Sequence, residues 1–528
     1  MTAETVARKR YSRSFFRKIG SGGFKTLAAR LSLTRTLSPP GNKPGGREPI
    51  GDRRRVGKAR SRNVLRAIGA AAIAVVGAMT AWPQVCAAET MESALVQAYQ
   101  NNPQLNAQRA SARATDENVP QALSGYRPRI SITGTAGEQY TDTVTKAVSQ
   151  GVKTYQNAHG YTTPWTAGAT ASQTLFNGFQ TANRTRAAEG QVSAAREALR
   201  VMEQTVLLAA ATAYMDVLRD TANLEVQRTN VRVLEETLKQ TRDRFNVGEV
   251  TRTDVAQSEA QLAAGQSAVA AAESVLNTSR ANYRQIVGTE PVNLAPGSPV
   301  DRFSPRVLST AIDTGLTENP NVTAAMYGVD VAHLQVKINE GALFPNLSLQ
   351  GNVQQASFPQ LQIVHQFTTS VLGQLTVPIY QGGGEFSLIR QSKESLAQQR
   401  LNLDLVRNQA RQAVVQAWGQ LQAAKAQITA AQSQVASSEV ALNGVREEAR
   451  VGQRTTLDVL NAQQALVNAR VALVAAQHDR VVASYNLLAS VGRLSPQVLG
   501  LPTNVYDPMV HYQQVRDAWT GIRIPDGR

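Results

Sequence analysis

The chain has 528 residues and a formal net charge of +16, which taken alone is typical of proteins that bind nucleic acid or acidic membranes. The charge is confined to one end of the chain. Residues 1–66 hold 18 of the 55 basic residues and three of the 39 acidic ones, and residues 67–88 hold neither. The remaining part, 89–528, has 37 basic and 36 acidic residues. Nucleic-acid binding by this nearly neutral part is therefore not supported.

The basic N-terminal end has the features of a leader. An apolar run of 15 residues at 67–81 follows several arginines and ends in small residues. This order is typical of a secretory signal, and the run is shorter than the roughly 20 residues of a transmembrane helix. We expect residues 1–88 to be removed together with Cys86, the only cysteine. Acylation of Cys86 is an alternative that Val85 disfavours, because lipoprotein signals place a small residue there. A translation start nearer the signal is a further alternative.

The region after the leader contains an internal repeat. At an offset of 217 residues, Asn102-Pro103 matches Asn319-Pro320. At an offset of 204, Leu175-Phe176-Asn177-Gly178 matches Ile379-Tyr380-Gln381-Gly382. We therefore divide the chain into a leader (1–88), a first repeat (89–304), a second repeat (305–492) and a C-terminal segment (493–528).

Each repeat is expected to contain a helix, two strands and two further helices. Period-two alternation of apolar and polar residues predicts strands at about 128–140, 164–176, 345–357 and 367–380. The 13-residue difference between the two offsets falls in the loop of the first strand pair, about 139–163, which is longer than the loop at about 357–366.

Proline-free stretches of 67 residues predict two long helices, 180–246 and 384–450, each about 100 Å long. Shorter helices are expected at 252–288, 306–342 and 456–492. The lengths suggest that 252–288 and 306–342 stack end to end beside a long helix, with a break at Pro291–Pro305. The helix 456–492 carries two apolar stripes at coiled-coil spacing, which predicts neighbours on two sides.

The strands have a further feature, because aromatic residues mark both of their ends. Tyr126, Phe176, Phe344 and Tyr380 flank the ends nearest the helices, and Tyr140, Trp165, Phe358 and Phe367 flank the loop ends. The spacing corresponds to roughly 28–35 Å for tilted strands, which is the thickness of a membrane with two aromatic girdles. Open sheet edges cannot lie in lipid, and closed barrels usually need about eight strands or more, so four strands per chain require self-association. A soluble antiparallel sandwich is the alternative.

Several motifs occur in the same order in both repeats. They are Tyr126-Arg127-Pro128, Leu175-Phe176-Asn177-Gly178 and Phe245-Asn246-Val247-Gly248, followed by Leu343-Phe344-Pro345, Ile379-Tyr380-Gln381-Gly382 and Val451-Gly452-Gln453-Arg454. This pattern resembles the TolC family of outer-membrane efflux and secretion ducts. The resemblance implies an α+β membrane protein, a homotrimer whose chains each give four strands to a twelve-stranded β-barrel. A periplasmic α-helical coiled-coil barrel is expected to continue it.

The resemblance also implies a function and partners. It implies a passive exit duct in the outer membrane, with its helices in the periplasm, that serves a tripartite efflux pump or a type I secretion system. The implied partners are a periplasmic adaptor, an inner-membrane ABC or RND-type transporter and outer-membrane lipid, with no cofactor and no nucleic acid. The alternative is a periplasmic coiled-coil adaptor or scaffold without a pore.

The motif Val-Gly-x-x-Thr-x-x-Asp-Val occurs twice, at 247–255 and 451–459. Gly248 and Gly452 are expected to end one helix in the left-handed conformation. Thr251 and Thr455 stand three residues before Asp254 and Asp458, which is the spacing of a capping box. Both aspartates therefore have a purely structural interpretation as helix caps.

The resemblance gives the second tip a function as well. It implies that Asp458 forms an acidic constriction at the periplasmic mouth. It also implies that Arg454 clamps the tip shut by bonding to Thr253 and Asp254 of the adjacent chain. Asn461 stands where the family usually has a second constricting aspartate, so a weaker cation filter is expected.

No catalytic constellation is found in the sequence. The five histidines are scattered, paired cysteines are missing and no metal-binding motif occurs. His478 lies on an apolar stripe of the helix 456–492, where a packed or lumen-facing residue is expected rather than a metal ligand. A secreted enzyme is accordingly a third class of function without candidate residues.

Overall fold

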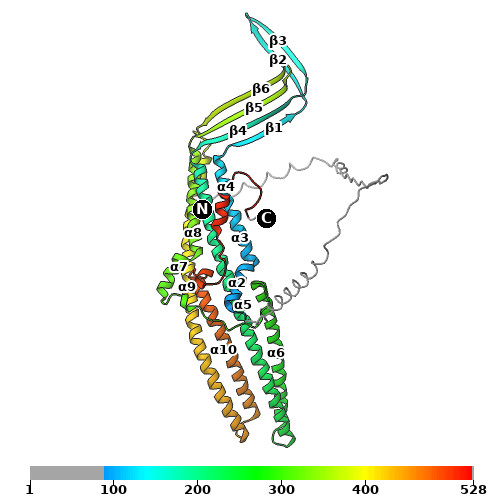
Figure 1. Ribbon diagram of the computed structural model, residues 1–528, viewed down its shortest axis with the longest axis vertical. Coiled ribbons are helices and arrows are strands. Elements are labelled where there is room, and N and C mark those ends of the chain that lie inside the picture. The colour runs from blue at the N-terminus through cyan, green and yellow to red at the C-terminus, as the bar shows by residue number, and fades with distance from the viewer. Residues whose placement is uncertain (1–87, 526–528) are drawn as a thin grey trace, which may run out of the picture. The chain divides into compact units, whose positions relative to one another are not determined.

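The computed structural model describes residues 88–525, which belong to one compact unit; the expected signal at 67–81 and Cys86 lie outside the described residues. The first repeat contains α2 (Met91–Asn101), α3 (Pro103–Asp116), α4 (Asn118–Leu123), β1 (Arg129–Ala136), β2 (Gln139–Ser149), β3 (Val152–Thr162), β4 (Trp165–Asn177), α5 (Gln180–Asn246) and α6 (Arg252–Val287). The second repeat contains α7 (Leu308–Glu318), α8 (Pro320–Glu340), β5 (Asn346–Gln360), β6 (Ile363–Thr376), α9 (Gly384–Arg450) and α10 (Thr456–Ser490). The short helices α11 (Pro496–Leu499) and α12 (Pro508–Val515) follow. Figure 1 shows the strands at one end of the helices and two helical turns at the other.

The larger sheet has four antiparallel strands in the order β1-β4-β5-β6, so the two repeats meet where β4 pairs with β5. β1 and β6 are its edge strands. β6 ends at Thr376 rather than at the expected 380, because Pro378 has no N–H for the strand ladder. The loop expected at 357–366 is mostly strand, since β5 and β6 continue to a short turn at 361–362.

The expectation of a loop at 139–163 is wrong, because β2 and β3 form a separate two-stranded hairpin there. Threonine, valine and tyrosine recur in both strands and favour extended backbone. The turn between them is Gln150-Gly151, whose φ angles of 48° and 79° are both positive, as a type I′ hairpin turn requires. Each chain therefore has six strands within the described residues, four of them in the larger sheet.

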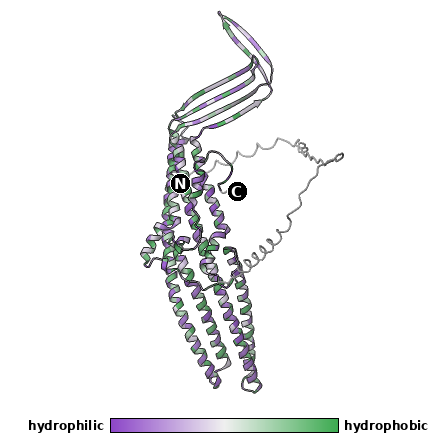
Figure 2. Cartoon of the chain, in the orientation of Figure 1, coloured by the Kyte–Doolittle hydropathy of each residue, from purple (hydrophilic) through white to green (hydrophobic). Residues whose placement is uncertain are grey.

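The helices form a wall one layer deep. In the half nearest the helical turns, α10 packs between α5 and α9, and α6 packs on the far side of α5. In the half nearest the sheet, α8 takes the place between α5 and α9, and α3 packs against α5. α5 and α9, each 67 residues long, run through both halves at the residues where the sequence predicts long helices. The two neighbours of α10 explain its two apolar stripes. Figure 2 shows hydrophobic and hydrophilic residues interspersed along the helices.

The short helices stack differently from our expectation. Asn102 caps α3 and donates from Nδ2 to the carbonyl oxygen of Ile286 in the last turn of α6, over 3.0 Å. Asn319 caps α8 and makes the same bond to Ser490 in the last turn of α10, also over 3.0 Å. The stacked pairs are thus α6 with α3 and α10 with α8, not 252–288 with 306–342. The expected helix 306–342 is broken into α7 and α8, because Pro320 cannot donate a backbone hydrogen bond.

The largest apolar core surrounds these two joints. It joins α2, the middle of α5 and the ends of α6 and α10, with Tyr99, Tyr214 and Tyr283 fully buried. Part of α5 is apolar enough to cross a membrane by composition, but half of that stretch is buried within the wall. The equatorial level, defined here as the level of the two joints, is therefore where the wall is most firmly packed.

Candidate functional site

The register of the larger sheet separates apolar from polar side chains. Ile132 lies opposite Ala169, which lies opposite Val353, so apolar residues share one face across three strands. The other face carries hydroxyl and amide side chains that bond to one another. Ser131 and Thr170 approach to 2.7 Å, and Thr135 and Thr166 approach to 2.6 Å. Gln350 donates to Gln374 over 3.0 Å. The sheet thus has one face suited to lipid and one suited to water.

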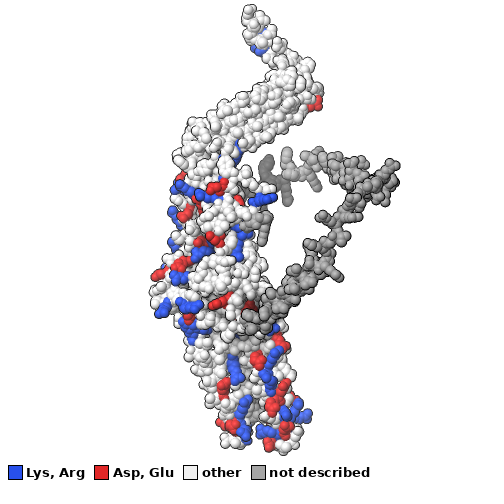
Figure 3. Space-filling model, viewed as in Figure 1, with Lys and Arg blue, Asp and Glu red and all other residues white. Residues whose placement is uncertain are grey.

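The charge distribution agrees with this division. β4, β5 and β6 contain no Asp, Glu, Lys or Arg, and β1 contains only Arg129 at its first position. Figure 3 shows the sheet as an almost uncharged band, with charged side chains dense on the helices. A charged side chain at the centre of a bilayer is costly. The band is therefore compatible with a position inside a membrane.

The aromatic residues lie at both ends of this band, with one displacement. Tyr126 and Phe344 are exposed just before β1 and β5, and Trp165 opens β4. Phe176 contacts Phe179 edge to face, with ring centres 5.3 Å apart. Phe358, Phe367 and Tyr380 are exposed as well. Tyr140 is the displaced residue: it lies at the base of the β2–β3 hairpin, opposite Tyr161, rather than at the end of β1.

The two helical turns, here called the first tip (247–251) and the second tip (451–455), have the same backbone. Gly248 and Gly452 have φ angles of 83° and 79°, which glycine adopts with little strain. In the first tip, the N–H of Glu249 bonds to the carbonyl oxygen of Arg244, and that of Gly248 to Phe245. The second tip repeats both bonds. This pair of bonds is the Schellman motif that ends a helix at glycine.

Both aspartates cap the helix that leaves the tip. Oδ2 of Asp254 accepts from the backbone N–H and the hydroxyl of Thr251, at 2.9 and 2.7 Å. Asp458 makes the same bonds with Thr455, at 3.0 and 2.9 Å. These bonds lower the pKa of both carboxyl groups, through the hydroxyl of Thr251 first at Asp254 and through the backbone N–H of Thr455 first at Asp458. The aspartates are therefore caps that also stay ionised at neutral pH.

The charged residues beside the tips form ion pairs of opposite polarity. In the first tip, Arg244 of α5 pairs with Glu249 after the turn, over 3.0 Å. In the second tip, Glu448 of α9 pairs with Arg454 after the turn, over 2.8 Å. Within the described chain, Arg454 thus contacts its own α9. Sequence reasoning missed Glu448, although it stands six residues before Arg454, beside the turn.

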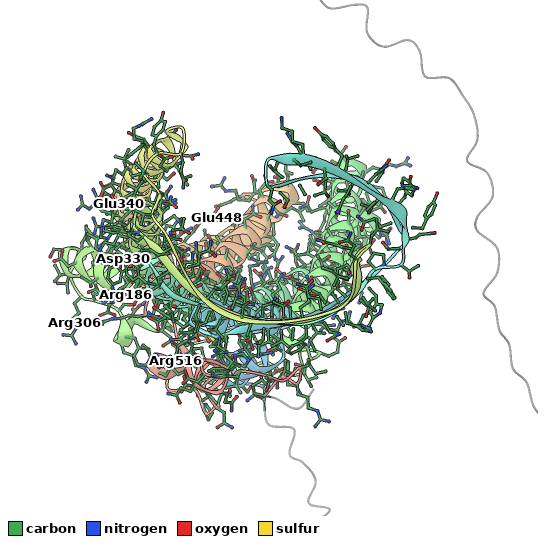
Figure 4. The ribbon with its side chains drawn as sticks, turned by 90° about the horizontal axis from the view of Figure 1, so that it is seen from above. Arg186, Arg306, Asp330, Glu340, Glu448 and Arg516 are labelled. Atoms are coloured by element: carbon green, nitrogen blue, oxygen red, sulfur yellow. The ribbon has the colours of Figure 1, made fainter. Side chains whose placement is uncertain are left out.

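The start of α10 has two different faces. Asp458 and Asn461 lie nearly opposite Thr456, Val459 and Gln463, because an α-helix turns by about 100° per residue. Thr456 and Val459 line a groove of about 660 Å³ between α5 and α9, here called the tip groove. Its charged lining residues are Arg232, Glu236, Arg244, Arg446, Glu447 and Arg450. Figure 4 looks along the wall from the sheet end and shows the chain curving around one open side.

A buried polar chain crosses the wall above the tip groove. Gln463 of α10 donates to Asn230 of α5 over 3.3 Å and accepts from Arg446 of α9 over 3.1 Å. Asn230 and Gln463 are both buried. Gln261 of α6 also donates to Gln464 of α10, over 3.0 Å. These bonds tie the two tip hairpins together within one chain.

His478 is a packed residue between α10 and α5. Its Nε2 lies 3.0 Å from Asp216, and its Nδ1 lies 2.9 Å from Asp479. Burial lowers the pKa of His478, but the bonds to Asp216 and Asp479 outweigh it, so the pKa is raised overall. No group of three or more His, Cys, Asp or Glu residues that could hold a metal occurs in residues 88–525.

Comparison with known proteins decides the family. The family model described as "Outer membrane efflux protein" matches residues 94–289 and 311–493, one match in each repeat. The chain belongs to the outer membrane efflux protein family. Outer membrane efflux protein BepC of Brucella suis is 43% identical over 84% of this chain and 94% of its own length. Alkaline protease secretion protein AprF of Pseudomonas aeruginosa is 26% identical over 76% and 84%.

The solved structures agree on the fold. The outer membrane protein VceC of Vibrio cholerae has a TM-score of 0.64 at 18% identity, covering 76% of this chain and 96% of VceC. As a member of the outer membrane efflux protein family, the chain is an exit duct of the outer membrane with a periplasmic helical part, and not a coiled-coil adaptor without a pore.

Proposed function

We propose that three copies of this outer membrane efflux protein close one twelve-stranded barrel and that the helical tips gate the duct. The observation that carries the closure is the larger sheet itself, whose apolar face is bounded by two edge strands, β1 and β6. Unpaired strand edges are excluded from lipid, so the edges of neighbouring copies must pair. A shared barrel leaves the polar face lining the lumen.

The gate is proposed at the second tip. Asp458 is ionised and lies on the face of α10 away from the tip groove, so three copies would place a ring of carboxylates in the mouth. Asn461, on the same face, adds no charge to this ring. Arg454 is exposed, bonds to Glu448 and is attracted by the charge of Asp458, and exposed ion pairs are weak. We propose that Arg454 clamps the closed tip through Thr253 and Asp254 of the adjacent copy.

Single-channel conductance in planar bilayers tests the clamp. Arg454→Ala should raise the conductance while the trimer still assembles, because the sheet and the helical stripes are unchanged. Arg450→Ala is the matched control, since Arg450 is an exposed arginine near the same tip that pairs with Glu447. If Arg454→Ala and Arg450→Ala both conduct like the unaltered protein, Arg454 does not hold the gate.

Cation selectivity tests the ring independently. Asp458→Asn keeps a side-chain oxygen to accept from Thr455 but removes the charge, so selectivity should fall and the helix should stay capped. Thr455→Ala instead removes the hydroxyl bonded to Asp458 and keeps the charge, so selectivity should remain. If Asp458→Asn channels stay as cation-selective as before, Asp458 is only a cap and the selectivity arises elsewhere.

We further propose that a periplasmic adaptor docks in the tip groove and links the duct to an inner-membrane transporter of the ABC or RND class. The groove lies on the face of α10 opposite Asp458, and its four arginines and two glutamates offer charged partners to a docking helix. Gln240→Cys, in the groove, should crosslink to the adaptor in cells, and Asn461→Cys should not. Mass spectrometry of the crosslinked protein would identify the adaptor class. Equal crosslinking at both positions would exclude the groove as the docking face.

A further inference from the structure

The C-terminal segment is fastened to the helical wall. α12 packs against α3, where Nδ1 of His511 lies 3.0 Å from Asp116 and both residues are buried. The guanidinium of Arg196 on α5 lies 4.9 Å from the ring centre of Tyr512. Figure 1 shows α12 beside α4, on the part of the wall nearest the sheet. The residues that follow α12 therefore leave it close to the membrane end of the wall.

Arg127 fixes the position of the segment after α12. Its Nη1 donates to the carbonyl oxygen of Ala518 over 2.6 Å, and its guanidinium lies 4.7 Å from the ring centre of Trp519. Arg127 stands two residues before β1 begins and directly after Tyr126 of the expected aromatic girdle. Trp519 is thereby held beside the start of β1, at the level of the expected aromatic girdle.

The residues beyond this contact are apolar and uncovered. Trp519, Ile522 and Ile524 have exposed fractions of 69%, 103% and 49% within the described chain. Three large apolar side chains in six residues are unfavourable in water. Figure 4 shows Arg516 on the convex side of the curved wall, away from its open side. The segment therefore faces the surroundings of the duct rather than its interior.

We propose that residues 519–524 insert into the headgroup region of the periplasmic leaflet of the outer membrane. Tryptophan is favoured at this depth because it combines a large apolar ring with an N–H donor. The segment is continuous with the girdle through the contact of Arg127 with Trp519. Arg516 precedes the apolar residues and Arg523 lies among them, and both can meet lipid phosphates. The segment acts as a peripheral anchor outside the barrel, separate from the gate and from the adaptor groove.

Fluorescence in a membrane of known composition tests the anchor. Ile522→Cys, in a Cys86→Ser background, would carry an environment-sensitive fluorophore in nanodiscs of phosphatidylethanolamine and phosphatidylglycerol. Its emission should shift to the blue and be quenched by lipids brominated near the headgroup. Gln514→Cys, exposed on α12, is the matched control and should remain unquenched. Unquenched emission at both positions would overturn the proposal.

Two further measurements separate lipid from protein as the occupant. Contact with lipid predicts emission that is both blue-shifted and quenched; blue-shifted emission that the brominated lipids fail to quench would mean that another copy of the chain covers the segment, and the proposal would be wrong. Trp519→Ser removes the ring on Arg127 without touching α12, and should reduce the quenching at Ile522 while the trimer remains assembled. Quenching unaffected by Trp519→Ser would exclude Trp519 as the residue that positions the anchor.

Discussion

The joint between α10 and α8 allows a quantitative prediction for Asn319→Ala. Asn319 is only 7% exposed, its Oδ1 accepts from the N–H of Asn321 over 2.9 Å, and its Nδ2 donates to the oxygen of Ser490. Loss of the cap costs about 1 kcal/mol. Leaving the carbonyl oxygen of Ser490 without its hydrogen-bond donor costs about 1–3 kcal/mol more. We expect the joint to lose roughly 2–4 kcal/mol.

Hydrogen exchange measured by mass spectrometry reports this loss at the joint. Amides at the start of α8 and the end of α10 should exchange about 30- to 700-fold faster, because about 1.4 kcal/mol corresponds to a factor of ten. Asn321→Ala is the control, since Asn321 is exposed and contributes only its backbone N–H to the cap. Asn319→Asp keeps the capping oxygen and loses the donor, so an intermediate acceleration is expected. Equal exchange in Asn319→Ala and Asn321→Ala would refute the role of the joint.

Three other predictions follow from the sheet, the second tip and the wall. Leu349→Arg on the apolar face should oppose insertion by roughly 2–4 kcal/mol, seen as a lower folded fraction in membranes, whereas Gln350→Arg on the polar face should insert normally. Gly452→Ala forces a φ of 79° on alanine at a cost of about 1–2 kcal/mol, so proteolysis at the second tip should accelerate, and an unchanged rate would contradict this. The raised pKa of His478 means that its contact with Asp216 stabilises the wall fully below the unfolded pKa of 6.5 and is lost as the pH rises through the folded value. Hydrogen exchange near His478, divided by the intrinsic exchange rate at each pH, should therefore accelerate as the pH rises above 6.5, and His478→Gln should abolish this acceleration.

Local signals predict much of the architecture. The absence of proline predicts the 67-residue helices, because nothing in 180–246 or 384–450 interrupts the backbone ladder. The Val-Gly-x-x-Thr-x-x-Asp motif predicts the tips, because every bond in a Schellman turn or a capping box joins residues close in sequence. Alternation predicts which strand residues share a face, since that depends only on parity.

Features that depend on distant residues were harder to predict. The stacking of α6 on α3 joins residues 184 positions apart, so neighbouring segments give no indication of it. The break at Pro320, by contrast, has a local signal, because proline cannot continue the helix that precedes it, and the expected single helix over 306–342 overlooks this signal. The β2–β3 hairpin has no counterpart in the second repeat. In a comparison of the two repeats it therefore looks like extra residues in a loop. The contacts of Arg454 with another chain remain a prediction, because they depend on how the copies of the chain pack together.

The common level of the two helix joints has a mechanical consequence. Gln204 of α5 marks this level, because it donates to the carbonyl oxygen of Gly492 just after α10, over 2.7 Å. From Gln204 to the end of α5 at Asn246 the helix rises about 63 Å, at roughly 1.5 Å per residue. Below this level the two helical hairpins, α5 with α6 and α9 with α10, are therefore long arms that can pivot at the joints. A bend of about 5° at the joints moves a tip that is about 63 Å away by about 5 Å. Angular changes too small to disturb the packing of the core can in this way displace the tips by more than the width of a water molecule.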